Sequence, residues 1–231
     1  MKATSQLAVL ALLVVMSGSG ALAQATPGTA TVKTSPAEAP PWEYNVTVDG
    51  YIIPDGTSYV NPVFTADHNW LHLEARYNYE NLRTGSLWVG YNFSWGDVDS
   101  GDKWEFDLTP IIGGVFGRIN GIAPGLEALL NYRKKIELSI TNEYVFDTDS
   151  KSGNFYYAWP QLTYSPLEWL HVGAVAQHTV AYHTPVSIQR GFLVGFSHKF
   201  SPSDRTLEFT TYVFNPGISG TTVVLETGVG F

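Results

Sequence analysis

Carboxylates recur at alternate positions along successive stretches of this chain, and they are the residues best suited to do chemistry. In the stretch 71–80, Glu74, Arg76 and Glu80 share one parity. Alternate side chains of an extended strand point to the same face, so these charges would line one wall. We expect the whole wall to comprise Glu74, Arg76, Glu80, Asn92, Glu105, Asp107, Glu127, Glu137, Glu143 and Glu226.

A wall of carboxylates with few counter-charges has two possible uses. Filled with water, it would form a pore that mildly favours cations, as carboxylate rings do in other channels. Paired with Arg76 and Arg190, the same groups would instead fill the interior and let a small barrel close. About twelve strands fall between filled eight-stranded barrels and open sixteen-stranded ones, so the strand count leaves both arrangements open.

Serine and histidine are present, but their spacing is poor for nucleophilic catalysis. Ser197 and His198 are adjacent, so on a strand they point to opposite faces and cannot share a proton. His171, His178 and His183 could sense pH or bind a metal. His171 and His183 share a parity but lie far apart along the chain. We therefore expect no enzyme, no metal site and no cofactor.

Charge and composition exclude further classes of function. The formal net charge of −8 argues against nucleic acid as a partner, because phosphate binding needs a basic patch. Asp97, Asp99 and Asp102 are spaced loosely like a calcium loop, but the later bidentate Glu is missing, so a solvated acidic turn is expected. The chain has no Cys, which excludes disulfides and a lipoprotein anchor.

The candidate residues lie on runs of alternating polarity, which predict β-strands. Runs of about ten residues, tilted by about 45°, are long enough to cross a bilayer. Short turns separate them, and no helical period intervenes, which predicts an all-β, antiparallel up-and-down transmembrane β-barrel of twelve strands, with 10–14 possible. The runs are at about 43–53, 58–67, 71–80, 86–95, 103–117, 126–132, 136–146, 154–164, 168–182, 187–200, 205–215 and 221–231.

Three features predict that the apolar face points outward to lipid. Acidic residues on the other face would be a costly interior for a soluble barrel. That face also carries glycines too small to fill an apolar core, namely Gly90, Gly173, Gly191, Gly195, Gly228 and Gly230. Aromatic residues lie near the ends of the apolar faces, where membrane barrels have girdles. These are Tyr77, Tyr79, Trp95, Trp104, Tyr164 and Tyr182.

The last stretch, 221–231, carries a recognisable pattern. Phe231, Val229, Leu225 and Val223 fall on one face, and Val224 is a misfit on the other. An alternating strand that ends on an aromatic residue resembles the terminal signal of bacterial outer-membrane β-barrels. The resemblance implies outer-membrane lipid and the assembly machinery as partners, and closure of the last strand on the first. The outer-membrane phospholipase A class is the enzymatic rival, but its His-x-Ser spacing is absent here.

The chain divides into three segments. Residues 1–23 have a basic start, an apolar run and small residues before a cleavage site, which predicts a secretory signal peptide. Residues 24–41, rich in Pro, Ala and Thr, are expected to be a flexible linker. Residues 42–231 would form the barrel. We therefore expect an outer-membrane protein of a Gram-negative-type bacterium, with a porin-like channel for small polar solutes as its function.

Some residues fit the pattern badly. Pro110 and Pro160 fall within strands of a barrel that has no free edge, so a bulge or a kink satisfied by water is expected at each. Asn142 and His178 fall on the lipid face, where a rim position or a change of register would accommodate them. The turns are short at both ends, which argues against a large receptor or an adhesin and predicts no constriction loop.

Overall fold

The barrel predicted from the sequence is present. The computed structural model describes residues 41–231 apart from 55, 182–186, 202–204 and 218–219, so the predicted signal peptide and most of the linker lie outside the described residues. The strands are β1 (Glu43–Ile52), β2 (Tyr59–His68), β3 (Leu71–Tyr77), β4 (Thr84–Tyr91), β5 (Phe93–Gly96), β6 (Trp104–Gly117), β7 (Gly121–Tyr132), β8 (Ile136–Asp147), β9 (Phe155–Leu167), β10 (Leu170–Ala181), β11 (Ser187–Phe200), β12 (Arg205–Phe214) and β13 (Thr222–Gly230), with a short 3-10 helix η1 (Lys151–Gly153).

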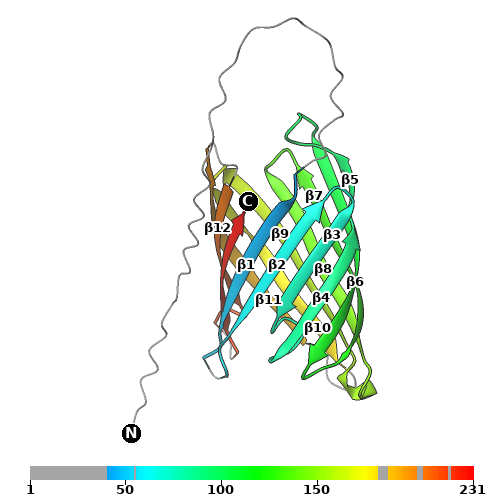
Figure 1. The fold of residues 1–231 in the computed structure, drawn as a ribbon. Helices are drawn as coiled ribbons and strands as arrows, with labels where there is room; N and C mark the ends of the chain where they lie inside the picture. The colour runs from blue at the N-terminus through cyan, green and yellow to red at the C-terminus, as the bar shows by residue number, and fades with distance from the viewer. Residues whose placement is uncertain (1–40, 55, 182–186, 202–204, 218–219) are drawn as a thin grey trace, which may run out of the picture. The chain divides into compact units, whose positions relative to one another are not determined.

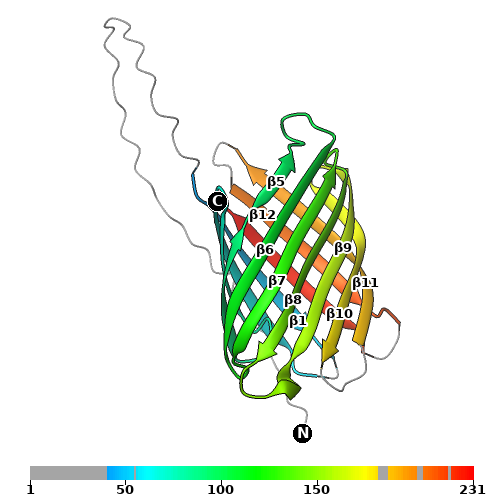
Figure 2. The same ribbon diagram turned by 90° about the vertical axis from the view of Figure 1, so that its right-hand side faces the viewer.

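Neighbours in sequence are neighbours in the barrel, and every pairing is antiparallel (Figures 1 and 2). β4 and β5 are separated only by Asn92 and both pair with β6, so they count as one of twelve barrel strands. β1 pairs with β13 from Asn45↔Gly230 to Ile52↔Val223. This pairing, together with that of β4 and β6, closes the sheet into a barrel. The predicted closed up-and-down barrel of twelve strands is confirmed. In the part of the chain that the structure describes, no helix is both long enough and apolar enough to cross a membrane.

The carboxyl terminus seals the closure. Phe231 and Tyr44 exchange two backbone hydrogen bonds of 2.9 Å, and their rings lie 5.7 Å apart. Val229 and Phe231 are exposed on the outer wall, and Val223 and Leu225 share their parity. Val224, the misfit of the alternating pattern, is fully buried. It therefore belongs to the inner face that the alternation assigns to it.

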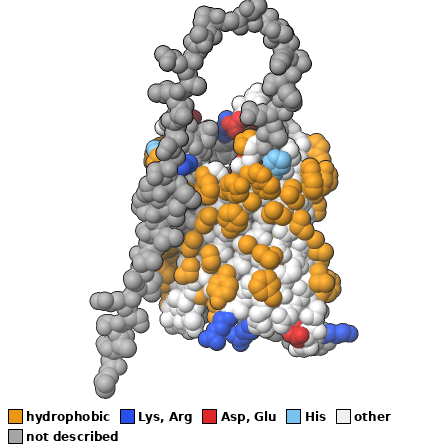
Figure 3. Space-filling model, in the orientation of Figure 1, with side chains coloured by type: hydrophobic (Ala, Val, Ile, Leu, Met, Phe, Trp, Pro, Cys, Tyr) orange, Lys and Arg blue, Asp and Glu red, His pale blue; other side chains and the backbone are white. Residues whose placement is uncertain are grey.

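The outer wall is apolar. Large hydrophobic side chains such as Leu87, Ile112 and Ile122 are 60%, 53% and 54% exposed. In Figure 3 hydrophobic side chains spread over the wall, while charged ones lie at its two edges. At the end that carries the terminus, outward aromatic residues stack in pairs, for example Trp70 with Tyr91 at 5.3 Å between ring centroids. An apolar wall with an aromatic belt is the surface that a barrel in hydrocarbon requires.

Pro110 and Pro160 interrupt the strand pairing locally, and neither causes a bulge. The register of β6 with β4 continues unchanged into β5, and the break at Asn92 lies beside the position opposite Pro110. The register of β9 with β10 is likewise the same on both sides of Pro160. Proline cannot donate a ladder hydrogen bond, so the pairing is interrupted locally without an extra residue. The register irregularity of β9 with β10 lies at Leu170–Val172.

Other expectations also need correction. β7 begins at Gly121, five residues before the run expected at about 126–132, so Pro124 lies within a strand. Asn142 lies in the middle of β8 with a regular register, and neither a rim nor a register change explains its outward position. His178 faces outward as well and meets Tyr156 edge-on at 5.9 Å. β3 ends at Tyr77, so the strand predicted over 71–80 is shorter than expected.

Candidate functional site

The candidate site is the interior of the barrel, where the inward faces of the strands meet. Alternation and register place the expected carboxylates on these faces, but at different depths. Four of these residues are half-buried and lie toward the end of the barrel that carries the carboxyl terminus: Asn92, Glu105, Asp107 and Glu137. Glu74, Arg76, Glu80 and Glu143 are buried, and Glu127 and Glu226 are half-buried.

Arg76 is the centre of the buried group. Its side chain is fully buried, and its guanidinium nitrogens lie 2.6 Å from Glu74, 2.7 Å from Glu143 and 3.4 Å from Glu127. Glu143 is on β8, Glu127 is on β7, and β3 adjoins neither strand, so these ion pairs cross the lumen. A buried charge persists only when it is paired and hydrogen-bonded, and Arg76 has its partners here.

Two aromatic rings complete the surroundings of Arg76. The guanidinium carbon lies 4.4 Å from the ring centroids of both Tyr79 and Trp88. The Trp88 indole donates a 2.9 Å hydrogen bond to Ser86. Gly113 lies opposite on β6, where a Cβ would come within 2.4 Å of the indole, so glycine is needed to accommodate this ring. Tyr79 was expected in the outer girdle, and its position beside Arg76 corrects that expectation. Tyr182, also expected there, lies outside the described residues.

A second polar network includes residues that sequence analysis left out. His72 Nδ1 and Asp67 Oδ1 are 2.8 Å apart, and Asn92 donates a 2.8 Å hydrogen bond to the same Asp67 oxygen. Thr109 donates in turn to Asn92 at 2.8 Å. His72 Nε2 lies 3.7 Å from Glu74, which connects this network to Arg76. Parity was a usable signal for His72, since it shares the face of Glu74.

Glu226 also has local partners. Both of its carboxylate oxygens lie 3.2 Å from the Tyr212 hydroxyl, which donates. Asp49, its neighbour across the β1–β13 ladder, is buried and accepts a 3.4 Å hydrogen bond from Asn61. Asp49 shares the parity of Asn45 and Thr47 on β1, so alternation was a usable signal for it as well.

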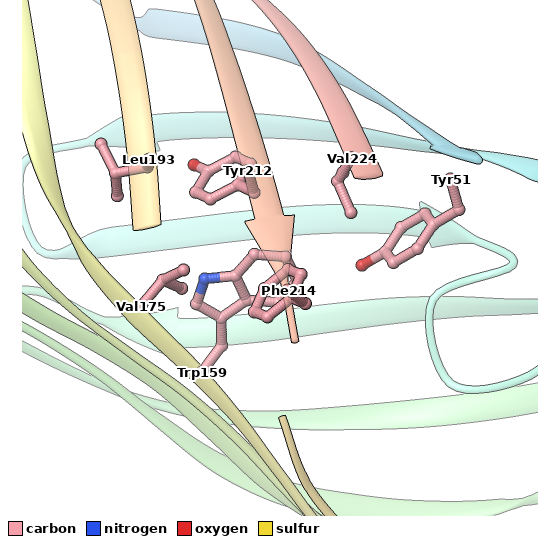
Figure 4. Packing of buried hydrophobic residues seen from close by; sticks show 7 residues of the cluster. All are labelled: Tyr51, Trp159, Val175, Leu193, Tyr212, Phe214 and Val224. Atoms are coloured by element: carbon pink, nitrogen blue, oxygen red, sulfur yellow. The ribbon is translucent and has the colours of Figure 1, made fainter. Parts of the chain in front are cut away.

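The inner faces farther from the terminus are apolar, which was not expected. One cluster gathers side chains from β1 and from β9 to β13 (Figure 4). Its buried members are Tyr51, Trp159, Val175, Leu193, Tyr212, Phe214 and Val224. A second cluster on the opposite wall consists of Trp88, Ile111, Val115, Ala123 and Val145. Together with the Arg76 ion pairs, these side chains pack the half of the lumen that lies away from the terminus.

The lumen contains a cavity at the end of the barrel that carries the carboxyl terminus. The cavity has a volume of about 450 Å³, and its lining is polar. It is lined by Pro41, Glu43, Asp67, Asn69, Asn92, Ser94, Asp107 and Thr109. The interior is therefore asymmetric, with a polar vestibule at one end and packed side chains toward the other.

Ser197 and His198 make no contact with each other, in line with their adjacent positions on β11. Ser197 instead lies beside His171, a pairing that the sequence analysis did not consider. The His171 nitrogens lie 2.8 Å from the Ser165 hydroxyl and 2.9 Å from the Ser197 hydroxyl. Ser197 also donates a 3.2 Å hydrogen bond to the carbonyl of Glu168. These contacts join three strands near their turns. His183 lies outside the described residues.

Two carboxylates of the acidic turn 97–102 accept hydrogen bonds from backbone amides of the same turn. Asp97 accepts hydrogen bonds from the backbone of Asp99 at 2.8 Å and of Ser100 at 3.0 Å, and Asp102 accepts one from the Asp97 backbone at 3.0 Å. Asp99 pairs with Lys134. Hydrogen bonding from Ser100 holds the pKa of the Asp97 carboxyl below its ordinary value. Within the described residues, no three metal-binding side chains are grouped so that they could hold an ion.

The barrel resembles known structures, although its sequence does not. No family model and no curated protein matches the sequence. The structure of the KdgM porin aligns with a TM-score of 0.51 and 12% identity, over 81% of this chain and 98% of that one. The NanC porin aligns with a TM-score of 0.51 and 14% identity, over 80% of this chain and 98% of that one. At such identities the likeness concerns architecture, and the chain has the barrel fold of the KdgM and NanC porins.

Proposed function

We propose that this protein is a porin-like barrel of a bacterial outer membrane that passes small polar solutes without chemical change. The observation that carries the proposal is the polar vestibule of about 450 Å³ inside a barrel of porin fold. The apolar outer wall supports a position in lipid. Export by the predicted signal peptide, residues 1–23, and the linker 24–41 are part of the same proposal.

The charge of the interior suggests which solutes pass. One structure of the KdgM porin is a complex with disordered oligogalacturonate, which is a polyanion. The vestibule here includes Glu43, Asp67 and Asp107, with Glu105 and Glu137 on neighbouring inward positions. Carboxylates repel anions and concentrate cations in a confined pore. We therefore infer a preference for neutral and cationic solutes over acidic oligosaccharides.

Planar-bilayer recordings test this preference. In a potassium chloride gradient, the wild-type channel should be selective for potassium, and Glu105→Gln combined with Glu137→Gln should reduce the permeability ratio by about two- to threefold. Both side chains are half-buried on the inner face, so the substitutions remove charge without removing a packed group. Glu168→Gln in an exposed turn is the matched control. An anion-selective wild-type channel would contradict the proposal.

A second function is favoured by one observation. Phe214, Val145 and Val224 are fully buried, and Glu143 is only 1% exposed, so the half of the lumen away from the terminus is filled with side chains. Such a barrel could serve as a structural outer-membrane protein with a closed interior. Correctly folded protein that gives no conductance in any bilayer would favour this second function.

The terminal residues form a further part of the proposal, as a signal for the assembly machinery. Phe231→Ala removes the terminal aromatic ring of this signal and should lower the amount of folded barrel in cells by up to about tenfold. Folding of the purified protein into lipid vesicles should change little, because the loss of the ring contact with Tyr44 is a small stability effect. Heat-modifiable migration on gels measures the folded fraction in cells and in vesicles. Equal loss in cells and in vesicles would indicate a purely structural role.

A further inference from the structure

The connection between β3 and β4, residues 78–83, bends into the lumen. Asn78 and Arg83 have φ of 61° each, a left-handed conformation that redirects the chain. The turn is fixed by a 2.8 Å hydrogen bond from the Asn78 amide to Thr84 and a 2.7 Å bond from the Arg83 amide to the Asn78 side chain. As a result Tyr79 points inward, although the alternation of β3 would place it outside.

Tyr79 reaches the opposite wall. Its ring meets Tyr157 of β9 edge-on, with 5.8 Å between centroids, and the Arg76 guanidinium lies over its face. Tyr157 is in turn 3.2 Å from Gln177, which also contacts the Tyr51 hydroxyl at 3.4 Å. These contacts join the β3–β4 turn, β9, β10 and β1 across the interior, and Tyr79 is one of the residues that span it.

The segment 78–83 differs from the rest of the packing in how it is held. Trp159, Phe214 and Val224 belong to strands that are hydrogen-bonded on both sides, so they can leave the lumen only if the barrel changes. The segment 78–83 lies between β3 and β4 and contributes its side chains from a turn. Backbone hydrogen bonds hold the ends of the turn, from the Asn78 amide to the Thr84 carbonyl and from the Arg118 amide to the Arg83 carbonyl. The Tyr79 ring is held by its contacts with Arg76 and Tyr157.

We propose that the segment 78–83 is the constriction element of this channel and that Tyr79 sets the size of solute that passes. The inference rests on the proposed channel function and deepens it. In the closed arrangement Tyr79 fills the space between Arg76 and Tyr157. Removal of the ring would widen the space beside Arg76 and its carboxylates, while the two apolar clusters stay in place.

The test compares two tyrosines that lie two residues apart. Tyr79→Ala should raise single-channel conductance in potassium chloride by about twofold or more, and it should allow liposomes to swell in raffinose as well as in arabinose. Tyr77→Ala is the matched control, because Tyr77 is 48% exposed on the outer wall. Tyr79→Phe should behave like the wild type, since the contacts of Tyr79 are made by its ring.

A second pair of variants guards against failure of Tyr79→Ala to fold. Glu143→Gln weakens the 2.7 Å cross-lumen contact with Arg76, while Glu226→Gln removes the same charge beside Tyr212. Longer or larger channel openings in Glu143→Gln than in both Glu226→Gln and the exposed-turn control Glu168→Gln would support the constriction. If folded Tyr79→Ala and Glu143→Gln show the conductance and size limit of a conducting wild type, the constriction is overturned and the channel stands. If the wild type and all variants are silent, the channel itself is overturned as well.

Discussion

Replacement of Arg76 by methionine should lower the free energy of unfolding by about 3–5 kcal/mol, the cost of removing one partner from a buried ion pair. Three carboxylates, those of Glu74, Glu127 and Glu143, would lose a shared cation within 3.4 Å. Methionine fills much of the same volume and keeps contact with the neighbouring aromatic rings. The expected loss is therefore electrostatic more than steric.

Urea titration of the barrel folded into lipid vesicles, followed by tryptophan fluorescence, measures this loss. Arg118→Met is the matched control, because Arg118 is exposed in a turn and its substitution should stay within about 0.5 kcal/mol of the wild type. Adding Glu143→Leu to Arg76→Met removes one of the stranded charges and should recover part of the loss. A single Arg76→Met variant as stable as Arg118→Met would show that the ion pairs contribute no net stability.

Alternation could predict the faces of the strands, because a period of two assigns each residue to one side or the other. Glu74, Arg76 and Glu143 are buried inside the barrel, on the faces that alternation assigns to them. Alternation could not show that a single arginine meets three carboxylates from three strands. That meeting depends on the register and closure of the barrel, which bring β3 opposite β7 and β8.

The apolar half of the interior was missed for a related reason. On β6, the inward residues change from Glu105 and Asp107 to Ile111 and Val115 without any change of parity. The polar inner residues near the end with the carboxyl terminus do not continue along the whole inner face. Tyr79 was misplaced because alternation holds only while the strand lasts, and the left-handed turn at Asn78 ends it. Asparagine is enriched among residues with positive φ, but a single Asn78 within an alternating run does not by itself locate the turn.

The strongest consequence of the apolar outer wall is a contrast between adjacent residues of β9. Leu162 is in the middle of the strand and 51% exposed on the outside, whereas Thr163 is inward and lies across from Glu137. In lipid, Leu162→Arg should lower the free energy of unfolding by up to about 2–4 kcal/mol, because an arginine on the lipid face is penalised and most strongly at the bilayer midplane. Thr163→Arg should cost far less, because the new charge meets Glu137 and water.

Both variants can be measured by the same urea titration in vesicles, with Leu162→Ala as a control for loss of the leucine itself. A soluble barrel would give the opposite order, because arginine on its outer wall would be solvated and arginine inside would be buried. The wall also determines which surroundings the wild type needs, since so large an apolar surface is not stable in water. If Leu162→Arg is as stable as the wild type and Thr163→Arg unfolds, the outer wall does not face hydrocarbon, and a channel across a membrane must be abandoned.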